Sequence, residues 1–241
     1  YSARLSDGAG RPLLPDGVVT DDVEASSDGA VIVYDAAPAV RRGGSDAGGP
    51  RTWWWSDSTQ THAITALPPD VLGLAVAADG RSVVVVAGGA TSGAVPSVVR
   101  IDLASGRSEP VCQGCVPAQK PGFLAHVALA LSDDGGLLAT STWATDMSSG
   151  FYGSRHSTPT TEQVLSLPGG SSRWTSGTAF CTPVTIAGDG TLVRSRAKDE
   201  THPLMLDEVT GVRGPSAASR RTGLPGYATG PLAGGWWYAA Q

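Results

Sequence analysis

The sequence predicts an all-β protein, a five-bladed β-propeller of four-stranded blades that is closed by pairing the N- and C-terminal strands in one blade. Two observations carry this prediction: a repeated turn, and two chain ends that complement each other. A turn that begins with small residues and ends in Asp-Gly recurs at Asp28, Asp79, Asp134 and Asp189, with separations of 51, 55 and 55 residues. A strand-built repeat of this length is typical of a propeller, because a single blade cannot bury its own faces.

Each Asp-Gly turn leads into a strand rich in apolar and β-branched residues. Such runs indicate strands buried on both faces, and they are predicted at 30–34, 82–87, 137–141 and 191–195. Farther along the chain, apolar strands enter turns rich in Asp, Ser and Gly at 98–106, 164–170 and 204–211. The glycine in these turns supplies the positive φ of a tight hairpin. Each repeat therefore holds two hairpins, which are the four strands of one blade.

The two ends of the chain complement each other. Residues 234–239 indicate a turn and a second strand, and residues 2–11 indicate a third strand and its turn. Together they would complete one further blade and leave no edge strand open. We therefore predict a single propeller domain over residues 1–241. Its blades are expected at about 18–68, 70–115, 122–177, 179–220, and 224–241 with 1–16.

The turn signatures resemble those of a known group of propellers. The small-x-Asp-Gly turn and the Asp-x-x-(Ser/Thr)-Gly hairpin, seen at 102–106 and 207–211, are similar to exported TolB and YVTN-type propellers, relatives of WD40. The resemblance covers the whole chain at the level of the fold, and the full YVTN tetrapeptide is absent. Members of that group typically have six or seven blades. The resemblance thus implies a compact five-bladed variant, or a further blade within a long loop.

Composition and charge narrow the classes of partner. Hydrophobic residues make up 41% and charged residues 16% of the chain, and 32 Gly with 17 Pro indicate many turns. The net charge of −5 is spread without a basic cluster, so we expect no nucleic-acid partner. No apolar run is long enough to cross a bilayer. Because the chain begins at Tyr1 without a leader, any export signal would have lain upstream, and we expect an extracellular or cell-surface protein.

Three cysteines allow several arrangements. Cys112 and Cys115 form a Cys-x-x-Cys motif, and Cys181 stands alone. A disulfide between Cys112 and Cys115, or one from Cys181 to either of them, suits an exported propeller. A redox or metal role is the alternative, although a second Cys-x-x-Cys pair is missing. We favour structural cysteines.

The predicted binding face lies opposite the Asp-Gly turns. It would be formed by loops at 35–51, 88–96, 143–160 and 197–203, with linkers near Asp21, Asp22, Asp70, Lys120 and Tyr227. The third of these loops combines aromatic rings with polar groups, a mixture that suits a sugar or a protein hot spot. We predict ligand-binding residues at Trp143, Asp146, Phe151, Tyr152, Arg155, His156, His126 and His202. Packing of Phe151 and Tyr152 back onto their own blade is the alternative.

The tryptophans outside this loop, and each histidine taken alone, are expected to have structural roles. Because side chains alternate between the two faces of a strand, at least one ring in each of the runs Trp53–Trp55 and Trp236–Trp237 should pack between adjacent blades. Trp174 is also expected to be a packing residue. If His126, His156 and His202 converged with Asp21, Asp22 or Asp146, they could hold a metal or act as acid and base. Each histidine alone is more often a hydrogen-bonded structural residue.

The sequence therefore predicts a binding module without catalysis, cofactor or metal. Nucleophile elbows, phosphate loops and zinc-protease helices are absent, and the expected inner strands are mostly small and apolar. The expected partner is a glycan or an exported protein, in which case the chain could belong to a larger secreted assembly. The alternative is a carbohydrate-active hydrolase or lyase with carboxylates and histidines at the channel mouth.

Overall fold

The structure is a computed structural model that describes part of the chain. Among the described residues all regular elements are β-strands, and none forms a helix that could span a membrane. The all-β class is therefore confirmed. The described residues are 2–3, 10–11, 18–19, 23–26, 29–38, 41–42, 45–46, 52–57, 59–68, 70–88, 95–118, 123–146, 161–177, 180–197, 205–213, 217–225, 227–232 and 235–239.

Three consecutive sheets are four-stranded antiparallel meanders, as the two-hairpin repeat predicts. Sheet two contains β10 (Val71–Val76), β11 (Ser82–Ala87), β12 (Ser97–Asp102) and β13 (Ser108–Gln113). Sheet three contains β14 (Phe123–Leu131), β15 (Leu137–Asp146), β16 (Thr161–Ser166) and β17 (Ser171–Gly177). Sheet four contains β18 (Phe180–Ile186), β19 (Leu192–Ala197), β20 (Met205–Thr210) and β21 (Ala218–Pro225).

Sheet one has the same ladder with a divided first strand. Both β3 (Val18–Val19) and β4 (Val23–Ala25) pair with β5 (Ile32–Pro38), which pairs with β8 (Thr52–Ser56) and through it with β9 (Thr61–Ala63). A small hairpin joins β6 (Arg41–Arg42) and β7 (Ser45–Asp46). The loop predicted at 35–51 thus begins later than expected, because residues 35–38 continue β5.

The two ends of the chain form separate hairpins. At the N-terminus β1 (Ser2–Ala3) pairs with β2 (Gly10–Arg11). At the C-terminus β22 (Tyr227–Leu232) pairs with β23 (Gly235–Ala239). Within the described residues these hairpins are two-stranded sheets that do not pair with each other. The predicted closure of one blade by both ends is therefore not seen in this part of the chain.

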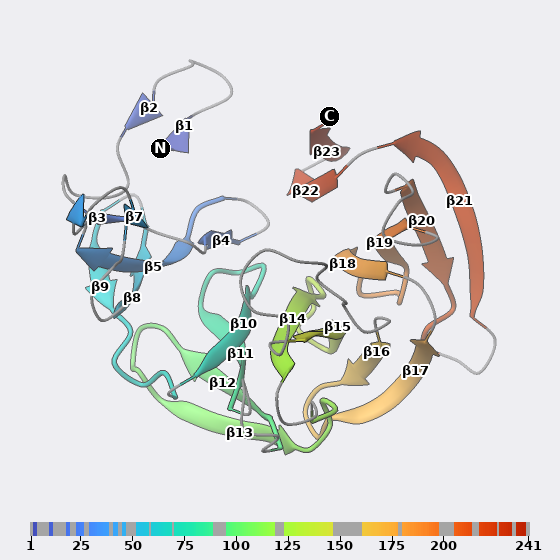
Figure 1. The fold of residues 1–241 in the computed structure, drawn as a ribbon, viewed down its shortest axis with the longest axis horizontal. Helices are drawn as coiled ribbons and strands as arrows, with labels where there is room; N and C mark the ends of the chain where they lie inside the picture. The colour runs from blue at the N-terminus through green and yellow to red at the C-terminus, as the bar shows by residue number, and fades with distance from the viewer. Residues whose placement is uncertain are drawn as a thin grey trace.

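The sheets stand around a common centre, as the blades of a propeller do (Figure 1). The first strands of successive sheets are neighbours: β10 contacts β4 and β14, and β18 contacts β14 and β22. Gly73 explains how β10 and β14 approach so closely, since a Cβ there would lie 2.7 Å from the Val127 carbonyl oxygen. The architecture is a β-propeller.

The Asp-Gly turns close as the sequence predicts. In each, the glycine N–H donates to the carbonyl three residues earlier, as in Gly80 to Ala77 at 2.9 Å and Gly135 to Ser132 at 2.8 Å. These glycines have positive φ values of 66° and 65°, a conformation that strongly favours glycine. The turns set the ends of the first hairpin in each sheet, and so define one face of the propeller.

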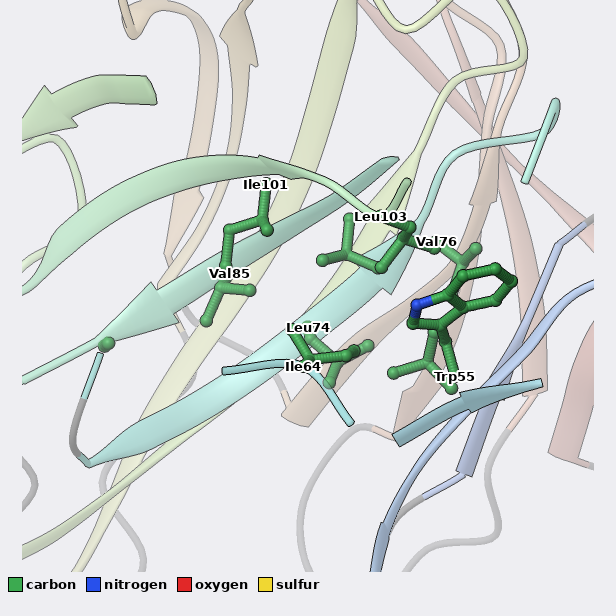
Figure 2. Packing of buried hydrophobic residues seen from close by; sticks show 10 residues of the cluster. Trp55, Ile64, Leu74, Val76, Val85, Ile101 and Leu103 are labelled. Atoms are coloured by element: carbon green, nitrogen blue, oxygen red, sulfur yellow. The ribbon is translucent and has the colours of Figure 1, made fainter. Parts of the chain in front are cut away.

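Neighbouring sheets pack face to face, and we call each interface a seam. The first seam, between sheets one and two, is shown in Figure 2. Trp55 is 8% exposed and packs there with Ile64, Leu74 and Val76. The expected inter-blade packing of the Trp53–Trp55 run is therefore confirmed for Trp55. The side chains of Trp236 and Trp237 lie outside the described part of the structure.

The second seam, between sheets two and three, is built from aliphatic side chains. Sheet two contributes three fully buried valines and sheet three two fully buried leucines, and Val116 adds to them from the segment after β13. This seam contains Val84, Val86, Val98, Val116, Leu138 and Leu165.

Candidate functional site

The third seam, between sheets three and four, changes character along its length. Near the Asp-Gly turns it is apolar, with Leu137, Ala139, Val164, Ile186, Leu192 and Val209 in one cluster. Farther from the turns, charged residues replace the apolar ones. In β19, Arg194 follows Leu192 on the same face, and in β20, Asp207 precedes Val209 on the same face.

Three buried charged residues and one partly exposed arginine meet at this polar end. The Arg194 guanidinium donates a hydrogen bond to Glu162 of sheet three and lies 3.7 Å from the Asp207 carboxylate. Arg196 donates to the same Asp207 oxygen at 3.3 Å. We call Glu162, Arg194, Arg196 and Asp207 the ionic cluster. Its two carboxylates are balanced by two guanidiniums, of which that of Arg196 is partly exposed, and Glu162 joins sheet three to sheet four.

Arg194 is also covered by an aromatic ring. Its guanidinium carbon lies 5.6 Å from the centre of the Trp174 ring, within the range of a cation–π interaction. Trp174 packs against the apolar end of the third seam as well. The expectation that Trp174 is a packing residue is therefore confirmed.

The ionic cluster holds buried polar atoms without a hydrogen-bond partner among the described residues. These are Arg194 Nε and Asp207 Oδ1. Unpaired buried polar atoms cost free energy, and removing one charged side chain of the cluster would leave its partners buried without compensation. Its carboxylates are buried and already engaged with guanidinium groups, which fits a structural role better than general acid or base chemistry.

A second ion pair crosses the third seam at the Asp-Gly turns. The Arg213 guanidinium lies 2.7 Å from the Asp134 carboxylate. The Ser132 hydroxyl and the Gly136 N–H donate to the same carboxylate, and these bonds, with Arg213, hold the pKa of Asp134 below its ordinary value. Asp134 and Arg213 are both about half exposed, so the pair is a surface contact of small energy.

The first hairpin of sheet three projects beyond its neighbours on the face opposite the Asp-Gly turns. Its ladder runs from Leu131↔Leu138 beside the turn to Phe123↔Asp146, whereas the equivalent ladder of sheet two ends at Val71↔Ala87. Accordingly β14 has 9 and β15 has 10 residues, whereas β10 and β11 of sheet two have 6 each, and β18 and β19 of sheet four have 7 and 6. The surplus of two to four residues per strand extends this hairpin by roughly 10 Å. We call residues 123–126 and 143–146 the ribbon.

The ribbon contains three of the predicted ligand-binding residues. Trp143 and Asp146 belong to β15, so the prediction that they lie in a loop is wrong. The strand continues because β14 supplies backbone partners: His126 lies directly opposite Trp143, and Phe123 lies opposite Asp146. Trp143 is partly buried.

The other predicted site residues fall outside the described structure. Nothing is described for Phe151, Tyr152, Arg155, His156 or His202, nor for Asp21 and Asp22, nor for the side chains of His126 and Asp146. Among the described residues, no three His, Cys, Asp or Glu side chains gather as a possible metal site.

The structure describes the pairing of two of the three cysteines. Cys112 and Cys115 are joined by a disulfide, which is the first of the arrangements considered above. Cys181 lies in β18, and its side chain is outside the described residues.

Sequence reasoning missed the ionic cluster. A signal was present, because Arg194 interrupts the run at 191–195 that was predicted to be buried on both faces. A charged residue inside such a strand requires a buried partner of opposite charge. That partner, Glu162, could be found only once the packing of sheet three on sheet four was known.

No family model matches the chain, and no curated protein matches it. Among solved structures the chain is similar to the acylaminoacyl peptidase of Pyrococcus horikoshii, with a TM-score of 0.53 and 10% identity over 88% of this chain and 34% of that one. It is similar to oligogalacturonate lyase from Vibrio parahaemolyticus, with a TM-score of 0.53 and 12% identity over 86% and 54%. A putative TolB from Agrobacterium tumefaciens has a TM-score of 0.49 at 15% identity over 83% and 64%.

The chain thus spans about a third of the length of that peptidase and about half of that lyase. At identities this low, the two likenesses with TM-scores above 0.5 concern the fold alone. A propeller fold supports many unrelated activities, so function has to be argued from the site.

Proposed function

We propose that the protein is an exported, five-bladed propeller that binds a glycan or a partner protein without turnover. The observation that carries this proposal is the ribbon, which projects from the face opposite the Asp-Gly turns. A hairpin that is longer than those of its neighbours would present the residues at its tip to a ligand. The contact surface would comprise the ribbon and the segment 147–160 that connects its strand β15 to β16.

The residue types at this tip fit such a ligand. Trp143 and Asp146 would act with Phe151, Tyr152, Arg155 and His156 of the connecting segment, and with His126 and His202. Aromatic rings stack on the apolar faces of sugars, and the polar groups would pair with hydroxyl groups. The same mixture of aromatic rings and arginine is enriched at the centres of protein interfaces.

Export is supported by the disulfide between Cys112 and Cys115. Disulfides persist in oxidising compartments and are rare in the cytosol of most organisms. The disulfide therefore supports the proposal that the protein is extracellular or at the cell surface.

The fifth blade would be completed by both ends of the chain. In support, β22 lies next to β18 as the first strand of a further sheet would. Figure 1 shows the hairpins β1–β2 and β22–β23 at the two ends of the row of sheets. Removing residues 1–11 should then lower the melting temperature measured by circular dichroism, since the fifth blade would lose strands. An unchanged melting temperature would contradict a closed ring.

The binding proposal is tested on an immobilised glycan array. Trp143→Ala should reduce the signal of the wild-type protein at least about tenfold, because a stacking ring at the contact centre is lost. Trp54→Ala is the matched control, since Trp54 is also a partly buried strand tryptophan but belongs to sheet one. Equal losses for both variants would point to a general effect on folding and would count against the ribbon.

A second candidate function is a carbohydrate lyase or hydrolase. An oligogalacturonate lyase is among the solved structures that share the fold, with a TM-score of 0.53 over 86% of this chain, and it gives this candidate a defined substrate to test. Incubation with oligogalacturonate and detection of an unsaturated product by ultraviolet absorbance tests it. Turnover that is abolished by changing Asp21, Asp22 or His126 would replace the binding proposal with this one.

A further inference from the structure

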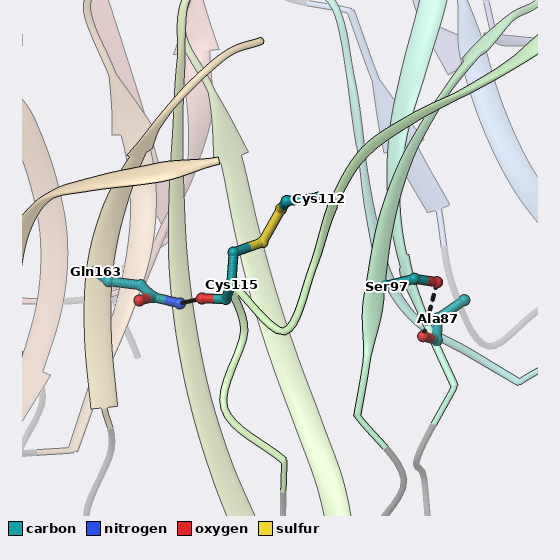
Figure 3. Close-up of a disulfide and its surroundings, with 5 residues drawn as sticks. All are labelled: Ala87, Ser97, Cys112, Cys115 and Gln163. Carbon is teal, nitrogen blue, oxygen red and sulfur yellow. Dashed lines mark hydrogen bonds between the residues drawn. A yellow bond between two sulfur atoms is a disulfide. The ribbon is translucent and has the colours of Figure 1, made fainter. Parts of the chain in front are cut away.

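The disulfide lies where the outer edge of sheet two meets sheet three (Figure 3). Cys112 is in β13, opposite Val98, and Cys115 follows the strand end by two residues. Between them, Gln113 and Gly114 are exposed, whereas both cysteines are partly buried. Gly114 adopts a φ of 75° and donates to the Pro96 carbonyl at 3.1 Å. A reductant could thus approach the bond from the side of this exposed turn.

Cys115, one half of the disulfide, also accepts a hydrogen bond across the second seam. Gln163 of β16 is 7% exposed, and its Nε2 donates to the Cys115 carbonyl at 2.6 Å (Figure 3). The next residue, Val116, is 1% exposed and packs with Leu138 and Leu165 of sheet three. The disulfide therefore fixes a turn that places the Cys115 carbonyl and Val116 against sheet three.

Sheet three also contacts the disulfide itself. Gly170, in the turn between β16 and β17, has a φ of 63°, and a Cβ there would lie 2.5 Å from Cys112 Sγ. The turn is thus packed directly on the sulfur, with no space for even a methyl group. Two thiols that are no longer bonded repel at the distance of a disulfide bond and must move apart. On the side of Gly170 they have no room to do so.

We propose that the Cys112–Cys115 disulfide is a reducible clasp that couples sheet two to sheet three. A dithiol such as dithiothreitol would attack one sulfur as its thiolate, forming a mixed disulfide, and its second thiol would then release the protein. The S–S bond breaks, the protein gains two thiols with two electrons and two protons, and the reductant becomes a cyclic disulfide. Reduction would release the Cys115 carbonyl from Gln163 and loosen the second seam.

The clasp is tested by a thermodynamic cycle in a Cys181→Ser background, which removes the remaining thiol. The shift in the urea midpoint caused by Gln163→Ala is measured in the oxidised protein, in the protein reduced with dithiothreitol, and in the Cys112→Ser/Cys115→Ser variant. The control is Thr222→Ala, which removes a hydrogen bond from Thr222 Oγ1 to the Leu206 carbonyl in sheet four, away from the disulfide.

The proposal predicts that the Gln163→Ala shift falls by at least about half once the disulfide is absent, while the Thr222→Ala shift is unchanged. Equal Gln163→Ala shifts in the three forms would overturn the coupling. Alkylation followed by mass spectrometry should find both cysteines modified after reduction of the folded protein. Alkylation only in the presence of urea would overturn the claim that the clasp opens in the folded state.

Discussion

The second and third seams lie on opposite faces of the same sheet and differ in chemistry. Strand alternation sends Leu138 into the second seam and Leu137 into the third. In β16 the same alternation sends Gln163 toward Cys115 and Glu162 toward Arg194. Among the described residues, the second seam thus adds the neutral Gln163–Cys115 hydrogen bond and a disulfide to its aliphatic core, whereas the third adds a buried ionic cluster.

The two seams are therefore expected to lose stability in different ways when their residues are substituted. An aliphatic seam loses stability in proportion to the volume removed, and it tolerates replacements of similar size. A buried ion network loses stability whenever one charged partner is removed, because the other charge remains buried without compensation. The predictions below separate the two behaviours.

The largest effect is expected from Arg194→Leu. This change leaves the Glu162 and Asp207 carboxylates buried without their shared cation, and should lower the free energy of unfolding by about 3–5 kcal/mol. Urea unfolding followed by fluorescence measures it. A variant in which Glu162, Arg194 and Asp207 are all replaced by apolar residues of similar size should recover most of the loss. If the single change costs less than the triple change, the ionic cluster does not behave as a buried network.

A somewhat smaller effect is expected in the second seam. Leu138→Ala removes a fully buried side chain and should cost about 2–4 kcal/mol, whereas Leu138→Met should cost less than about 1.5 kcal/mol. Arg194→Lys in the third seam is the matched conservative change, and it should cost more than Leu138→Met because Lys cannot reproduce the fork of the guanidinium. The same unfolding experiment ranks them. The reverse order would remove the distinction between the seams.

The smallest effect belongs to the surface pair at the Asp-Gly turns. Hydrogen bonds and Arg213 lower the pKa of Asp134, so its ionised form stabilises the folded state above the ordinary aspartate pKa, and this stabilisation is lost as the pH falls through the lowered value. Asp134→Asn should therefore cost less than about 1 kcal/mol at neutral pH. Unfolding curves collected against pH should converge with those of the wild type in acid. A difference that grows as the pH falls would contradict this assignment.

The sequence predicts those elements that are determined by residues close to one another along the chain. The Asp-Gly turns at Gly80 and Gly135 can be predicted from sequence, because a positive φ and a hydrogen bond to the carbonyl three residues earlier depend only on neighbouring residues. The strands that follow them were found because continuous apolar runs have few other uses. Their arrangement in four-stranded antiparallel sheets follows from two hairpins in each repeat.

The candidate site was less predictable because its features depend on partners far along the chain. The run at 142–146 mixes Thr, Trp, Ala and Asp, which suits a loop or a strand equally well. Pairing with β14 decides in favour of the strand and creates the ribbon. Likewise Glu162 and Arg194 are 32 positions apart, and only the packing of two sheets brings them together.

The proposed contact surface comprises the ribbon and the segment 147–160 that connects β15 to β16, and an exchange within that segment tests it. Residues 147–156 are replaced by a Gly-Ser linker of the same length, and binding to the glycan array is compared with that of the wild-type protein at matched melting temperature. We predict that the signal is lost while circular dichroism and the urea midpoint stay unchanged. Undiminished binding by this folded variant would contradict the account.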